Sequence, residues 1–165
     1  MKYKLKKITH LSGNKASVYS VILNDEVKTL YEKFLMENFS LFLSEIKDIN
    51  KRLETIGKVT GAREIYFKLK EGNLGDGVAA LYDLPSKNLR LYCIRYGTQL
   101  IILGGGGIKP KTVRALQEVD KLQEENYTLR ALSKIITEKL NDDLFFTNDG
   151  KDFIGDLEFE DNNND

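Results

Sequence analysis

This chain has few of the cysteine and histidine residues that form disulfides and metal sites, and it lacks long apolar runs. Cys93 is the only cysteine, which excludes an internal disulfide framework and a cysteine-based zinc site. His10 is the only histidine, so a paired-histidine ribonuclease site is excluded, and we interpret it as a surface residue. No apolar run approaches the roughly 18 residues of a membrane span, and the N-terminus lacks the apolar core of a signal peptide. We therefore expect a cytoplasmic protein with no membrane partner and no cofactor.

The four glycines at 104–107 do not form a known phosphate-binding motif. A P-loop needs Gly-Lys-Ser/Thr at the start of a helix, but Ile108 separates Gly107 from Lys109 and a proline follows. The dinucleotide fingerprint fails too, because its last glycine would fall on Lys109. We favour a strand end that bulges or lets another backbone approach. The alternative is that backbone N–H groups approach a phosphate there.

Charge is distributed unevenly, although the net charge is zero. Residues 1–111 contain 19 Lys/Arg against 11 Asp/Glu, a net of +8, whereas residues 142–165 contain 9 acidic residues against one lysine, a net of −8. This pattern fits a polyanionic partner and an acidic tail that competes with it, or simply a solvated surface with a solubilising end.

Two helices are predicted before the main run of strands. Residues 24–35 carry apolar side chains on one helical face, with Asn24 as the N-cap, and residues 39–56 carry a second apolar stripe. The short link at 38–40 predicts an antiparallel helical hairpin. Further helices are expected at about 113–122 and 127–140.

Strands are predicted at 17–23, 64–70, 78–82 and 89–96, and in the apolar run from Leu100. The 89–108 hairpin, which turns at Gly97, should lie at the centre of a sheet because Leu100 to Leu103 has no polar face. Cys93 is expected to pack in the core.

A basic and aromatic surface follows if the strands at 64–70 and 89–96 are neighbours. Strand alternation then places five side chains together: Tyr66, Lys68, Lys70, Arg90 and Tyr92. Tyr96 follows on the same strand face, and Lys109 and Lys111 form a basic rim after the hairpin. Cations and aromatic rings are what unpaired RNA requires, although a solvated sheet face or a dimer surface has the same pattern.

The order of elements resembles the RelE/HigB-like superfamily of bacterial toxins, and its HigB-like branch most closely. The resemblance covers about residues 16–122. The segments that carry it are AREIYFKLKEG at 62–72, NLRLYCIRYGTQLIILGGGGIKPK at 88–111 and VRALQEVDKL at 113–122. It implies an α+β fold in which a small, antiparallel-rich sheet packs against an N-terminal helical hairpin. Residues 1–122 would form this domain, and residues 123–165 a C-terminal helical and acidic extension.

The resemblance also implies an activity: a metal-independent endoribonuclease that cleaves mRNA, usually on the ribosome, and is neutralised by a small antitoxin protein. By position, the catalytic residues would be Arg90, Lys68, Lys70 and Lys109, and the RNA-binding residues would be Tyr66, Tyr92, Tyr96 and Lys111. No metal ligand is implied. The Tyr, His or Asp that the family often has near its last helix has no counterpart after Lys111. The alternative is a catalytically eroded fold that binds a protein or RNA.

Overall fold

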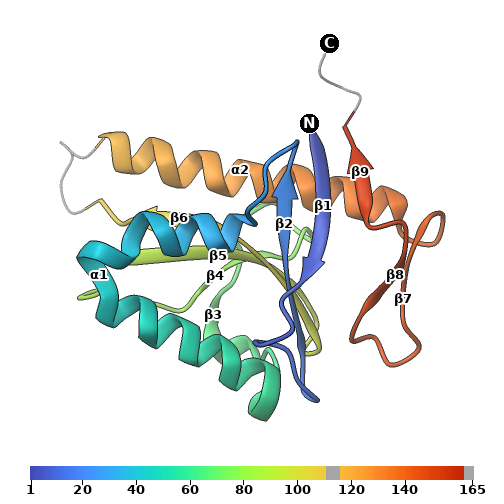
Figure 1. The fold of residues 1–165 in the computed structure, drawn as a ribbon, viewed down its shortest axis with the longest axis horizontal. Coiled ribbons are helices and arrows are strands. Elements are labelled where there is room, and N and C mark those ends of the chain that lie inside the picture. Colours follow the sequence, from blue (N-terminus) through green and yellow to red (C-terminus); the bar gives the residue numbers. More distant parts are fainter. Residues whose placement is uncertain (111–115, 162–165) are drawn as a thin grey trace.

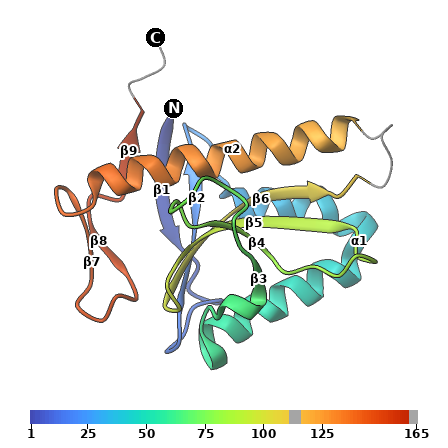
Figure 2. The same cartoon turned by 180° about the vertical axis from the view of Figure 1, so that it is seen from behind.

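The computed structural model describes residues 1–110 and 116–161. Within these ranges, seven strands form one mixed sheet, two form a separate hairpin, and a long helix lies on each face of the large sheet (Figures 1 and 2). The strands are β1 (Lys2–Lys7), β2 (Ser17–Leu23), β3 (Phe67–Lys68), β4 (Val78–Leu81), β5 (Leu89–Tyr96), β6 (Leu100–Ile108), β7 (Leu144–Phe146), β8 (Phe153–Gly155) and β9 (Glu158–Glu160). The helices are α1 (Leu30–Thr55) and α2 (Leu116–Lys139), with a π-helical turn η1 (Ile56–Thr60) and a 3-10 turn η2 (Glu64–Tyr66) between α1 and β3. No described helix is long and apolar enough to cross a membrane.

The predicted central hairpin is confirmed. The sheet order is β3-β4-β5-β6-β2-β1-β9, so β6 lies in the middle, antiparallel to β5 and parallel to β2. Leu100, Ile101, Ile102 and Leu103 are each 0% exposed, because both faces of the strand are covered. An apolar run without alternation is what a strand buried on both faces requires.

The two faces of the sheet support two separate cores. Alternate residues of β5 point to opposite sides: Leu89, Leu91 and Cys93 pack with the α1 core, and Tyr92 and Ile94 pack with the α2 core. Apolar residues of α1 and α2 complete the two clusters.

The predicted fold class was wrong. The structure has a seven-stranded mixed sheet, a two-stranded sheet, one long early helix and one later helix, instead of a small sheet against an N-terminal helical hairpin. No loop separates two helices at 38–40, because Asn38 is buried within α1 and donates from Nδ2 to the carbonyl of Phe34 (2.8 Å). The irregularity lies at Phe42 instead, where φ is −130° and ψ is 40°, and α1 bends (Figure 1).

The start of α1 also differs from the prediction. Asn24 adopts φ 52° in a turn after β2 and is not the N-cap. The N-cap is Thr29, whose hydroxyl accepts from the N–H of Glu32 (3.1 Å), while the Glu32 carboxylate accepts from the N–H of Thr29 (3.1 Å). Such a reciprocal capping box satisfies two backbone donors at the helix start, and it stabilises a start at Thr29 more than a single Asn24 side chain would stabilise a start at Asn24.

The sheet is larger than predicted because both ends of the chain join it. Lys2–Lys7 forms β1, with Tyr3 and Leu5 buried and the intervening lysines facing outward. In the acidic tail, β9 pairs with β1 and buries Phe159. Because β9 and β3 lie at opposite edges of the sheet, the described part of the acidic tail does not cover the basic residues of β3. The predicted domain boundary at residues 122 and 123 falls inside α2.

The glycine run allows α2 to approach β6 closely. A side chain at Gly104 would overlap the Leu129 side chain, and one at Gly105 would overlap the carboxylate of Glu125. On β5, Tyr92 lies opposite an irregularity in the register, where β6 contains one residue more than its partner. The predicted bulge and the predicted approach of another backbone are therefore confirmed, since a side chain at Gly106 would overlap the backbone of Arg90.

Candidate functional site

Two of the predicted lysines converge on a buried carboxylate. Lys68, at the end of β3, and Lys109, just after β6, place their Nζ atoms 2.8 and 2.7 Å from the two carboxylate oxygens of Asp83. Asp83 follows β4 by two residues, and its side chain is only 4% exposed. Lys109 Nζ also donates to the carbonyl of Leu84 (2.9 Å). Three segments distant in sequence therefore meet at one end of the sheet.

The electrostatics of this cluster are set by Asp83. Burial alone would raise the pKa of Asp83, but ion pairs and hydrogen bonds with Lys109 and Lys68 outweigh it and hold the pKa below its usual range. The carboxylate is therefore ionised at neutral pH and compensates one of the two ammonium charges. The side chain of Lys68 is 33% exposed and that of Lys109 is 12% exposed, so the cluster reaches the surface.

Arg90 lies on the same face of the sheet as the lysine pair. Lys68 pairs with Ala80 on β4, and Ala80 pairs with Tyr92 on β5, so these three residues face the same side. Arg90 precedes Tyr92 by two residues on β5 and therefore faces that side too, opposite Gly107 of β6. Arg90 is half-buried and hydrogen-bonds the hydroxyl of Tyr92. Its Nε atom is buried and has no hydrogen-bond partner among the described residues. A buried donor without a partner is rare in folded proteins, so Arg90 is a candidate for a ligand contact.

Sequence reasoning missed two residues of this site, Asp83 and Tyr82. Tyr82 is 45% exposed, and Lys68 Nζ lies 6.0 Å from the centroid of its ring. Its backbone carbonyl accepts from Nη1 of Arg52 on α1 (2.5 Å). Both residues lie in the segment YDLPSKN, which resembles an ordinary turn. Only the cations that flank Asp83 in space show that it has another role.

Of the other predicted site residues, Tyr92 is brought to this site through its bond to Arg90, whereas the others in the described part of the chain lie elsewhere. Tyr92 and Tyr96 lie beneath α2, where Tyr92 is 5% exposed and Tyr96 packs edge-on against Phe146 and Phe153. Neither ring is available for stacking on a base. Tyr66 packs against the opposite, α1-side core. Lys70 lies beyond β3, exposed, with φ 65°. Lys111 lies outside the described residues.

Cys93 does not contribute a nucleophile in this structure. It is 1% exposed in the α1-side core, and burial raises the pKa of its thiol to about 12. The thiolate, which is the reactive form, is therefore scarce at neutral pH. Among the described residues, no group of three or more His, Cys, Asp or Glu side chains could hold a metal ion.

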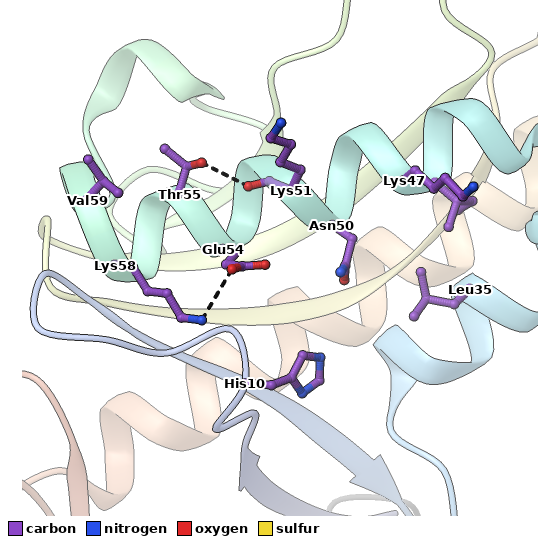
Figure 3. A pocket seen from close by; sticks show the side chains of 10 residues that line it. His10, Leu35, Lys47, Asn50, Lys51, Glu54, Thr55, Lys58 and Val59 are labelled. Carbon is purple, nitrogen blue, oxygen red and sulfur yellow. Dashed lines mark hydrogen bonds and ion pairs between the residues drawn. The ribbon is translucent and has the colours of Figure 1, made fainter.

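Apart from the Asp83 cluster, the structure has a hollow between His10 and α1 (Figure 3). Its volume is about 670 Å³. Lys58 is paired with Glu54 there (3.2 Å), and the hydroxyl of Thr55 donates to the carbonyl of Lys51 (3.0 Å). The ammonium of Lys51 points away from His10 (Figure 3). The polar groups of this hollow thus bond mostly within α1 and do not converge on one point, in contrast to the Asp83 cluster.

Asp83 should make the stability of the protein depend on acid in a specific way. A carboxyl group whose pKa is lowered in the folded state stabilises the fold above its unfolded pKa of about 4, and this contribution is lost as pH falls through the lower folded value. Asp83→Asn should therefore lower the free energy of unfolding at pH 7 by about 2 kcal/mol. The difference from wild type should shrink below about pH 4.

Urea unfolding at pH 7, 5, 4 and 3 measures this difference. Glu54→Gln is the matched control, because the Glu54 side chain is 50% exposed and pairs with Lys58 at the surface, away from Asp83. Its effect should be small at every pH, since exposed ion pairs contribute little. A deficit of Asp83→Asn that stays constant from pH 7 to 3 would contradict the assignment.

Comparison of this chain with protein-family models, curated proteins and solved structures found no match in any of the three. The function therefore has to be argued from the site.

Proposed function

We propose that this protein is an endoribonuclease that cleaves mRNA at the Asp83 cluster, and that it is the toxin of a toxin–antitoxin pair. The observation that carries the proposal is the convergence of Lys68 and Lys109 on Asp83, with Arg90 on the same face of the sheet. With the Asp83 charge subtracted, this group carries a net charge of +2. The proposal of a ribosome-bound substrate and a small antitoxin partner rests on the resemblance of residues 16–122 to the RelE/HigB-like superfamily.

The chemistry that suits this site is attack by a ribose 2′-oxygen on the adjacent phosphorus. The P–O5′ bond breaks, which leaves a 2′,3′-cyclic phosphate and a 5′-hydroxyl. Arg90 and one lysine would stabilise the negative charge that builds on the phosphoryl oxygens. Lys68 is paired with a carboxylate, so it fits the role of proton donor to the leaving 5′-oxygen better than the role of base. The 2′-hydroxyl proton would pass to water.

A second candidate function is a protein- or RNA-binding module that uses the same surface without cleavage. The observation that favours it is the low pKa of Asp83, which makes this carboxylate a weak base. Among the described residues, no histidine lies beside the cluster, since His10 lines the hollow on the other side of the sheet. Binding of RNA without cleavage needs only the positive charges of this site and no base.

Inducible expression of the wild-type chain, followed by mapping of RNA 5′ ends, tests the two candidates. The nuclease proposal predicts growth arrest and new 5′-hydroxyl ends within mRNAs within minutes of induction. Cells that carry the empty vector provide the baseline. If purified protein with translating ribosomes yields no new ends but still binds mRNA, the nuclease proposal is wrong and the binding module is correct.

A further inference from the structure

The segment that carries Asp83 is held in place from three directions. Arg52 of α1 bonds the carbonyl of Tyr82 (2.5 Å), and Glu45 of α1 accepts from both the backbone and the side-chain N–H groups of Asn88 (2.7 and 2.8 Å). From the β6 side, the N–H of Lys109 donates to the carbonyl of Asn88 (2.7 Å). The position of the Asp83 carboxylate is therefore fixed by the fold and not by the two lysines alone.

We propose that Asp83 is a positioning residue, which presents Lys68 and Lys109 as a clamp for one phosphate of single-stranded RNA, with the next base stacked on Tyr82. This inference rests on the proposed function and specifies its substrate. Each lysine ammonium has three N–H donors. Among the described residues, Lys68 uses one on Asp83, and Lys109 uses two, on Asp83 and on the carbonyl of Leu84. The remaining donors are what a ligand oxygen would use, and the two side chains reach the surface with 33% (Lys68) and 12% (Lys109) exposure.

Holding the lysines in place has an energetic consequence. A free lysine side chain loses rotamer entropy when it is ordered on a ligand. Because Asp83 already orders both side chains, this cost is met on folding instead of on binding. Preorganised charges of this kind stabilise a transition state more than mobile ones.

The exposed ring of Tyr82 selects the form of RNA. It lies beside Lys68, and Tyr82 as a residue is 45% exposed. A base must leave its stack to lie on such a ring, and stacking on the aromatic side chain then contributes to its binding. Bases in a duplex are already stacked and paired. The site should therefore accept single-stranded RNA and reject double-stranded RNA.

Asp83→Asn separates positioning from simple electrostatics. It removes one negative charge, so electrostatics alone would tighten RNA binding and leave turnover unchanged or faster. Positioning predicts the opposite for turnover: kcat should fall at least tenfold, while KM stays within about twofold or decreases. Both constants are measured with an mRNA fragment bound to purified ribosomes.

A double-mutant cycle with Lys68→Gln shows whether Asp83 acts through its lysine partners. If it does, Asp83→Asn should change kcat less than threefold in the Lys68→Gln background, because coupled residues are not additive. Lys68→Arg, which keeps the ion pair, should restore most of the activity that Lys68→Gln loses. Equal tenfold losses in both backgrounds, or no loss in either, would overturn the inference.

Tyr82 provides a test that does not depend on whether Asp83→Asn folds. Tyr82→Ala should weaken binding of a single-stranded RNA oligonucleotide about tenfold, Tyr82→Phe should not, and neither change should affect a duplex of the same sequence. Unchanged single-strand binding by Tyr82→Ala overturns the stacking role.

Failure of the proposed function and failure of this inference give different results. Absence of cleavage by the wild type overturns both. Cleavage by the wild type together with a normal kcat in folded Asp83→Asn overturns the inference alone.

Discussion

Gly106→Ala is expected to lower the free energy of unfolding by about 3 kcal/mol or more, and to leave little folded protein at 37 °C. A Cβ at this position would overlap the backbone carbonyl oxygen of Arg90 on the neighbouring strand. Because that atom is backbone in the middle of the sheet, only a shift of β5 against β6 can relieve the clash. Urea denaturation followed by circular dichroism measures the loss.

Gly107→Ala is the matched control, because it inserts the same methyl group one residue further along β6. Its nearest neighbour would be Cγ of Lys121, at 3.1 Å, in a side chain that can move. We expect a change in unfolding free energy of less than about 1 kcal/mol. Similar effects of both substitutions would show that the close approach of β5 and β6 at Gly106 is not what constrains this strand.

The same glycines show why parts of the fold could be predicted from the sequence. The apolar run from Leu100 and the turn at Gly97 specify a buried hairpin by local pattern alone. That a helix covers the glycines could not be predicted, since Leu129 is some 25 residues away and its pairing with Gly104 is a tertiary contact. Local pattern determined the strand, and distant packing determined what lies on it.

The errors in the predicted fold have a similar cause. Residues 38–40 were interpreted as a link because polar residues interrupt the apolar stripe, but Asn38 forms its hydrogen bond inside the helix. Polar side chains that bond to their own helix give no loop signal. β1 was missed although Tyr3 and Leu5 alternate with lysines, because a strand so rich in lysine is typical of a solvated surface. The segment forms a strand because it pairs with β2 on one side and β9 on the other.

For the site, the sequence could predict the cations but not their surroundings. Lys68 and Arg90 were expected to share a surface on the premise that their strands are neighbours, and Lys109 was expected as part of a basic rim. The premise was wrong, because β4 lies between β3 and β5. Lys68 and Arg90 still face the same side, because alternation along a strand is a local rule. The same rule placed Tyr92 beside them, and it does lie on that face, but α2 covers it. Which part of a sheet face a later helix covers is not encoded in strand periodicity. The counter-ion Asp83 was missed for the same reason, since its partners are 15 and 26 residues away in sequence.

Arg90→Ala is expected to lower the rate of RNA cleavage about 100-fold while the protein stays folded. The guanidinium is held on β5 by its bond to the hydroxyl of Tyr92, and its buried Nε donor has no partner among the described residues. Loss of one preorganised donor from a partly dry site raises the barrier to reaction more than it weakens binding. We therefore expect the change in kcat, with KM altered by less than about fivefold.

Arg63→Ala is the control for this substitution, because Arg63 is an exposed arginine just before η2. It removes the same charge from the same half of the chain, so it reproduces any general loss of attraction for RNA. If Arg90→Ala cleaves RNA at the same rate as Arg63→Ala, and both melt within a few degrees of wild type, Arg90 has no part in the reaction. A loss confined to Arg90→Ala instead shows that placement on the sheet, and not total charge, determines activity. Cleavage is scored at single-nucleotide resolution by mapping 5′ ends, so that background degradation is counted separately.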